Sequence, residues 1–185
     1  MDANEALRKL TEGNARFVAG KSAGHSLSQH RKDTMAGQKP YAIVLTCSDS
    51  RVPPEHIFDA GIGELFVVRT AGNIAGPVAL GSLEYAAEHL HSPLLVVMGH
   101  TSCGAVAAAC ASDSAPGHID TIVKEMQPAV KAGNKEPARV VPENVQCVLA
   151  TIRGKSHALS HLEKEGKLKL VGAVYSLESG AVALL

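Results

Sequence analysis

Apolar residues along the chain follow two periods in turn, which predicts short strands separated by helices. Runs rich in Val, Ile and Leu have the length of buried strands, and they lie at residues 41–46, 65–70, 94–98 and 168–176. Helical spacing of apolar residues between these runs predicts helices at residues 2–19, about 29–35, 53–60, 77–91, 103–110, 118–131 and 142–165. The last run, residues 181–185, is expected to form a short strand.

Strands that alternate with helices, without hairpin signals between them, are typical of parallel βαβ units with right-handed crossovers. We therefore expect an α/β fold with a mainly parallel four-stranded sheet, flanking helices and a short antiparallel C-terminal edge strand. A chain of 185 residues that is 45% hydrophobic suits one domain, residues 1–185. Its first part, about 2–35, is expected to form a helical arm whose first helix has no apolar partner in its own chain and lies across a neighbouring subunit.

The composition excludes several classes of function. Lys plus Arg is 18 and Asp plus Glu is 18, so no net charge favours nucleic acid or an anionic membrane. Aromatic residues make up 3% of the chain and Trp is absent, which argues against a base-stacking surface. The N-terminus lacks the apolar run of a signal peptide, so we expect a cytoplasmic protein. Cysteines there more often bind metal or do chemistry than form disulfides.

Two of the four cysteines lie where predicted strands end. Cys47 ends the first strand, and His100 and Cys103 follow the third within the segment Gly99–Gly104. Ligand sites of open α/β sheets are found at the carboxyl ends of strands. A catalytic zinc takes three protein ligands and keeps a fourth position for water, and these three residues match that count.

The spacing of His100 and Cys103 predicts that both project from one face of a helix start. A single buried cysteine is as often a small hydrophobic residue, and Cys110 and Cys147, on predicted helices, are interpreted in that way. Because Cys47 and Cys103 both lie at strand ends and His100 lies near Cys103, we interpret these cysteines as metal ligands and not as core residues.

Asp49 and Arg51 lie two and four residues after Cys47. A structural ion pair is the commoner role of such residues. Here one turn would hold a metal ligand, a proton acceptor and a cation, and Arg51 would keep Asp49 ionised. An Asp49 that is not held is a possible fourth zinc ligand, which would close the site to water.

The motif C-S-D-S-R at 47–51, followed by G-H-x-x-C-G at 99–104, resembles the β-class carbonic anhydrases. The resemblance covers nearly the whole chain, and further matching segments lie at residues 12–17, 63–69, 71–73, 82–86 and 171–175.

This resemblance implies zinc ligands at Cys47, His100 and Cys103, with Asp49 and Arg51 as the catalytic dyad. It also implies that Gln38, Phe66 and Tyr85 bind the substrate, partly from a neighbouring subunit. The expected assembly is therefore a dimer or a dimer of dimers.

The function implied is that of a lyase with one Zn²⁺ per chain, which reversibly hydrates CO2 to bicarbonate and a proton. Phe66 and Tyr85 would form a dry wall, and Gln38 would hydrogen-bond bicarbonate. Two alternatives stay open. Hydrolases of carbon disulfide or carbonyl sulfide resemble this family and share its ligands. The second alternative is a non-catalytic binding module that zinc stabilises. The Asp49–Arg51 dyad argues against it, because a purely structural zinc site would gain from a fourth protein ligand.

Overall fold

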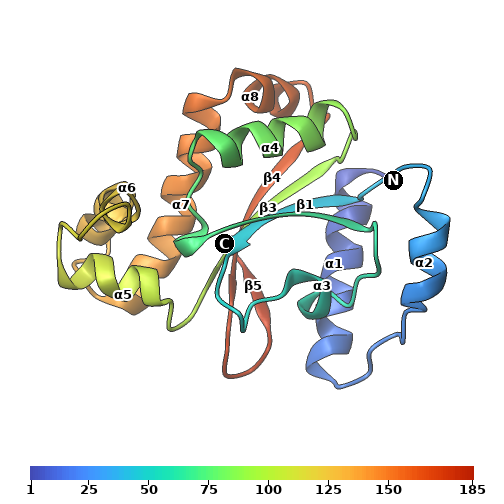
Figure 1. Ribbon diagram of the computed structural model, residues 1–185, viewed down its shortest axis with the longest axis horizontal. Helices are drawn as coiled ribbons and strands as arrows, with labels where there is room; N and C mark the ends of the chain where they lie inside the picture. The colour runs from blue at the N-terminus through green and yellow to red at the C-terminus, as the bar shows by residue number, and fades with distance from the viewer.

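The computed structural model describes residues 1–185, in which helices and strands alternate along most of the chain (Figure 1). The strands are β1 (Ala42–Cys47), β2 (Leu65–Thr70), β3 (Leu94–His100), β4 (Lys169–Tyr175) and β5 (Val182–Leu184). The helices are α1 (Ala3–Val18), α2 (Leu27–Asp33), α3 (Pro54–Ile57), α4 (Pro77–Glu88), α5 (Gly104–Ala111), α6 (Ile119–Ala132), α7 (Pro137–Lys155) and α8 (His157–Lys164), and a short 3-10 turn, η1, covers Ala71–Asn73.

The five strands form one sheet in the order β2-β1-β3-β4-β5. The first four are parallel to one another, and β5 pairs antiparallel with β4. The predicted α/β class, the parallel sheet and the antiparallel C-terminal edge strand are confirmed. Helices α4, α7 and α8 lie on one side of the sheet, and α1 and α3 lie on the other (Figure 1).

Strands β1 and β3 are buried along their whole length because both faces of the sheet are covered. Successive side chains point to opposite faces. Ile43 and Leu45 of β1 therefore join the apolar cluster under α4, α7 and α8, whereas Ala42 and Val44 join the cluster that includes α1. The two central strands are thereby fixed from both sides.

A third apolar cluster lies beyond the strand ends, among α5, α6 and α7. It contains Cys47 and Cys103 together with Val106, Met126 and Val141. The two thiols predicted as ligands are therefore held in an apolar environment next to the sheet edge.

The prediction that the first helix has no partner in its own chain is wrong. Helix α1 begins with the expected capping box between Asp2 and Glu5. Its apolar face then packs on its own sheet, where Ala6 and Leu10 are fully buried against the strands. Only α2, which has no buried residue, fits the description of an arm.

The predicted helix at 142–165 is in fact two helices, and the first begins five residues earlier. Pro137 occupies the first turn of α7, where a proline is tolerated, so Pro142 lies inside that helix and does not start it. Ser156 then adopts an extended conformation and caps α8 through a hydrogen bond from the Leu159 N–H.

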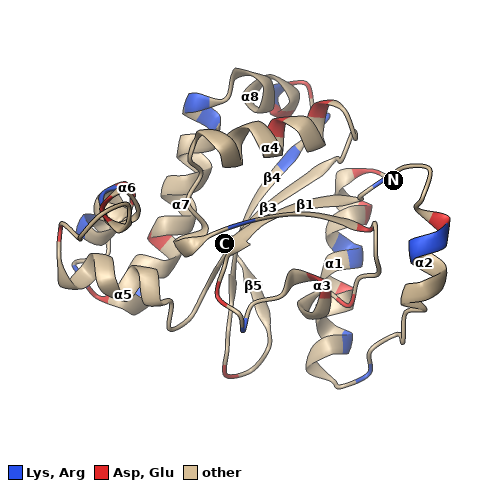
Figure 2. Cartoon of the chain, in the orientation of Figure 1, with Lys and Arg blue, Asp and Glu red and all other residues tan.

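Charged residues of both signs are interspersed along the outer helices, while the strands carry few of them (Figure 2). None of the helices combines the length and the apolar character needed to cross a membrane.

The docking of α1 on its own chain can be tested at Gly13. A methyl group at this buried position would overlap the Phe58 carbonyl oxygen, so Gly13→Ala should lower the free energy of unfolding by about 1–3 kcal/mol in chemical denaturation. Gly154 of α7 is exposed and has no atom within 4 Å of an added methyl group, and Gly154→Ala should stabilise the protein by up to ~1 kcal/mol. Equal effects of the two changes would contradict the observed packing of α1.

Candidate metal centre

The candidate metal centre lies where the adjacent parallel strands β1 and β3 end. Cys47 is the last residue of β1, and His100 is the last residue of β3. Cys103 follows as the residue that precedes α5. The expectation that His100 and Cys103 share one helix face is wrong, because β3 continues through His100 and a turn with Ser102 at φ +55° separates the two residues.

Side-chain ligand atoms of Cys47, His100 and Cys103 all lie within 4.8 Å of one another. The three residues are at most 5% exposed. The structure therefore brings together the three residues that the sequence predicted as ligands.

The tautomer of His100 leaves its Nε2 atom free to bind a cation. His100 Nδ1 lies 2.9 Å from the Thr101 carbonyl oxygen, which can only accept, so Nδ1 carries the hydrogen and Nε2 keeps its lone pair. Nε2 is buried and has no hydrogen-bond partner. Unpaired buried polar atoms are rare, and a metal ion at this point would satisfy Nε2. Two thiols and one imidazole are a ligand set that suits zinc.

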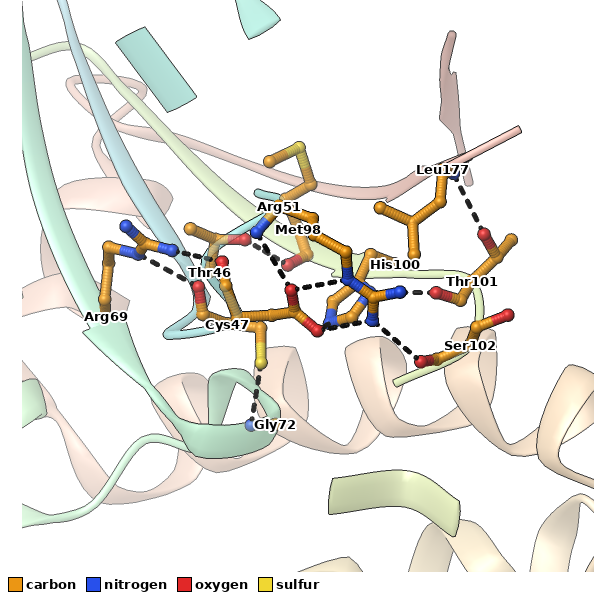
Figure 3. A network of polar contacts seen from close by, with 11 residues as sticks. Thr46, Cys47, Arg51, Arg69, Gly72, Met98, His100, Thr101, Ser102 and Leu177 are labelled. Atoms are coloured by element: carbon orange, nitrogen blue, oxygen red, sulfur yellow. Dashed lines mark hydrogen bonds and ion pairs between the residues drawn. The ribbon is translucent and has the colours of Figure 1, made fainter. Parts of the chain in front are cut away.

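Hydrogen bonds also activate the sulfur of Cys47. The Cys103 thiol lowers the pKa of Cys47, and the same contact raises the pKa of Cys103. The Gly72 N–H, from η1, donates to Cys47 Sγ at 3.3 Å and further favours the thiolate (Figure 3). A divalent cation would favour the thiolate form of both cysteines.

Asp49 and Arg51 form a bidentate ion pair beside the cluster. Arg51 Nε donates to Asp49 Oδ1 at 2.9 Å, and Arg51 Nη2 donates to Oδ2 at 2.7 Å. The Arg51 guanidinium holds the pKa of the Asp49 carboxyl well below its usual range. Asp49 Oδ2 lies 3.9 Å from His100 Nε2, so the carboxylate faces the place that a metal would occupy. Arg51 also reaches the Ser102 carbonyl oxygen at 3.4 Å.

Gln38, Phe66 and Tyr85 do not join this cluster within one chain. Gln38 is exposed and precedes β1, which extends about 17 Å from Ala42 to Cys47. Phe66 pairs with Ile43, about 13 Å along the strand from Cys47. The Phe66 and Tyr85 rings lie 6.2 Å apart, and Tyr85 is 48% exposed on α4. The two rings thus form one patch, away from their own metal centre.

The other two cysteines are separate from the site. Cys110 and Cys147 are partly buried and pack against the apolar cluster among α5, α6 and α7, as expected of core thiols. All four cysteines are free.

Sequence reasoning missed Arg69. This residue of β2 donates to the Cys47 carbonyl oxygen at 3.0 Å (Figure 3). It also donates to the Asp49 carbonyl oxygen at 2.6 Å. A single arginine near the end of an otherwise apolar strand, Leu65–Thr70, is the signal that could have identified it.

Comparisons with known proteins agree with this site. The sequence profile described as carbonic anhydrase matches residues 42–182. Carbonic anhydrase 2 of Mycobacterium tuberculosis H37Rv is 43% identical over 188 residues, which cover 97% of this chain and 91% of that protein. The carbonic anhydrase of Pseudomonas aeruginosa is 37% identical and covers 97% of this chain and 87% of its own.

Solved structures lead to the same family. The β-carbonic anhydrase CafA of Aspergillus fumigatus superposes with a TM-score of 0.76 at 26% identity, over 98% of this chain and 89% of that one. A structure described as one of two tetrameric β-carbonic anhydrases from Sordaria macrospora gives a TM-score of 0.74 at 27% identity, over 98% and 97% of the two chains. This chain therefore belongs to the β-class of the carbonic anhydrase family, and it is an enzyme of that family.

Proposed function

We propose that the protein catalyses the zinc-dependent, reversible hydration of CO2 to bicarbonate and a proton. The observation that carries this proposal is the buried group of Cys47, His100 and Cys103, whose His100 Nε2 lacks any partner. These residues would hold one zinc ion per chain. When bound, zinc supplies Lewis acidity to a water molecule, and two thiolates weaken that acidity, so the water should ionise above the pH of ~7 typical of a three-histidine site.

The Asp49–Arg51 dyad would control the fourth position. Both carboxylate oxygens of Asp49 are engaged by Arg51, which keeps them available as hydrogen-bond acceptors towards a water and keeps the carboxylate off the metal. An Asp49 released by Arg51 would be close enough to become the fourth ligand, because Oδ2 lies 3.9 Å from His100 Nε2. Arg51 would thus keep the site open.

The substrate pocket would be completed by a second copy of the chain. Strand β2 is an edge strand, and its apolar residues Leu65–Val68 are only half-buried. Tyr85 and Val78, on the α4 helix that packs against β2, are 48% and 85% exposed. An uncovered apolar edge strand favours association. We call Phe66, Val78 and Tyr85 with the β2 edge the β2–α4 surface, and we propose that it forms a homodimer.

The dimer would bring Phe66, Tyr85 and Gln38 towards a metal centre across the interface. The two rings would give CO2 an apolar wall, and the Gln38 amide would donate to bicarbonate. A dimer of dimers remains part of the proposal, because the Sordaria macrospora relatives are described as tetrameric. A cytoplasmic location is also proposed, since thiols stay reduced there.

Parallel assays with CO2, carbon disulfide and carbonyl sulfide on one zinc-loaded sample test the substrate. We expect CO2 hydration to dominate. Turnover of only the sulfur compounds would support the related hydrolases, and no turnover with full zinc would support a non-catalytic module.

The ligand set can be tested by metal analysis. Cys103→Ala should lose zinc and CO2 hydration together, because two protein ligands remain. Cys110→Ser and Cys147→Ser are matched controls that should keep about one zinc per chain, since neither thiol lies in the cluster. Full zinc occupancy in Cys103→Ala would refute the assignment.

The dyad can be tested through pH and two substitutions. We expect the hydration rate to rise through the alkaline range and to fall near or below neutrality, where Asp49 stays ionised and competes with unionised water. Arg51→Ala should release Asp49 and reduce turnover by more than about 10-fold while zinc stays bound.

Asp49→Ala should also impair turnover, but it should leave the fourth position to water at every pH. A rate that does not change between about pH 6 and 9, or an Arg51→Ala enzyme as active as the parent, would contradict the gating role of the dyad.

The assembly can be tested by sedimentation. The parent should sediment as a dimer or larger, and Val78→Lys should shift it towards monomer with loss of activity, because a charge would enter the β2–α4 surface. Ile119→Lys is the matched control, since Ile119 is 56% exposed on α6. A fully active monomeric parent at the assay concentration would exclude an obligate dimer.

A further inference from the structure

Arg69 reaches from β2 to the turn that follows β1. Its Nε donates to the Cys47 carbonyl oxygen at 3.0 Å (Figure 3), and its Nη2 donates to the Asp49 carbonyl oxygen at 2.6 Å. Arg51 pairs with a carboxylate, whereas Arg69 uses both of these hydrogen bonds on main-chain oxygens. The planar guanidinium fork suits two acceptors at once. Arg69 therefore hydrogen-bonds to the main chain at both ends of the segment Cys47–Asp49.

The segment Cys47–Asp49 connects a candidate metal ligand to the carboxylate that could compete for the fourth metal position. Cys47 carries a sulfur of the metal cluster, and Asp49 carries the carboxylate whose Oδ2 lies 3.9 Å from His100 Nε2. Rotation of the Asp49 side chain is opposed by its bidentate pair with Arg51. A shift of the Asp49 main chain is opposed by Arg69, and also by the Val52 N–H, which donates to the same carbonyl oxygen at 3.0 Å.

We propose that Arg69 is a positioning residue that holds the main chain of residues 47–49 so that Asp49 stays on Arg51 and away from the metal. The inference rests on the proposed function, because it concerns the fourth metal position. Both hydrogen bonds of Arg69 go to main-chain oxygens, and neither goes to a candidate ligand side chain or to the Asp49 carboxylate. It acts through the backbone, and two arginines thus secure one aspartate, one at its side chain and one at its main chain.

A purely structural role is the competing interpretation, because the same hydrogen bonds tie β2 to the end of β1. The two roles differ in what they protect. A structural tie protects the stability of the fold, whereas a positioning residue protects access to the fourth position at equal metal content. Arg69 is exposed, so its truncation leaves no buried cavity, and the fold should survive.

The test uses Arg69→Met, which keeps an unbranched side chain as far as the position of Nε and removes both donors, and Arg69→Lys, which keeps the charge without the fork. Arg153→Met is the matched control, because Arg153 is also exposed and makes three side-chain hydrogen bonds, all to Glu163 on α8. Zinc per chain, kcat and KM for CO2, and the visible spectrum of the Co²⁺-substituted protein titrated with azide are measured on each. Azide reports an open fourth position.

Arg69→Met should keep its zinc, lose about 10- to 100-fold in kcat with little change in KM, and lose the spectral response to azide. Arg69→Lys should recover part of that response, and Arg153→Met should behave as the parent. In an Asp49→Ala background, Arg69→Met should no longer change the azide response, because the competing carboxylate is gone.

Three results would overturn the inference: an Arg69→Met protein that matches Arg153→Met in kcat per zinc and in azide response, loss of metal from Arg69→Met, or an effect of Arg69→Met that persists without Asp49. Failure of the proposed function gives a different result. A metal-loaded parent without CO2 hydration would refute that function, while the azide titration would still decide the role of Arg69.

Discussion

The site depends on the parallel pairing of β1 with β3. Because the two strands run side by side in the same direction, their last residues, Cys47 and His100, come to one edge of the sheet. The buried Thr46 hydroxyl donates to the Met98 carbonyl oxygen at 2.9 Å and adds a tie immediately before the ligands. Both strands are buried on both faces, so a slip in register would expose apolar side chains and separate the ligands. Packing of the core and assembly of the metal centre are thus one constraint.

Hydrogen bonds around the cluster determine what the ligands can do. The Thr101 carbonyl oxygen fixes the tautomer of His100, and the Gly72 N–H favours the Cys47 thiolate. Both contacts come from main-chain atoms, whose position follows from the fold and not from side-chain identity. Only Asp49 is held by side chains, because Arg51 hydrogen-bonds to its carboxylate and Arg69 hydrogen-bonds to its carbonyl oxygen. The candidate ligands are therefore oriented by main-chain atoms, while the one group that could close the site is held by two arginine side chains.

The sheet and the grouping of Cys47, His100 and Cys103 could be predicted well from the sequence because both depend on local patterns. An apolar run followed by Cys47 or His100 is visible without any knowledge of tertiary structure. Patterns could not show that β3 continues through His100, since Gly99 resembles a strand end, or that α1 packs on its own sheet. They also could not show Arg69, because nothing in the chain order relates a residue of β2 to carbonyl oxygens after β1. Contacts between main chain and distant side chains leave little trace in a single sequence.

The positions of Phe66 and Tyr85 would connect catalysis with assembly in the proposed dimer. Their rings form one patch on the β2–α4 surface, at the open edge of the sheet and about 13 Å along β2 from the level of their own Cys47. Apolar side chains at such an edge are a liability for a monomer, and they are of no use to the metal centre of the same chain at that distance. Both difficulties have the same solution if a second chain covers the edge, because its own strand ends can then approach the rings. The β2–α4 surface, whose exposed apolar side chains are unfavourable in a monomer, would then form one wall of the partner's substrate pocket. Association of two chains would therefore be a condition for binding an apolar substrate.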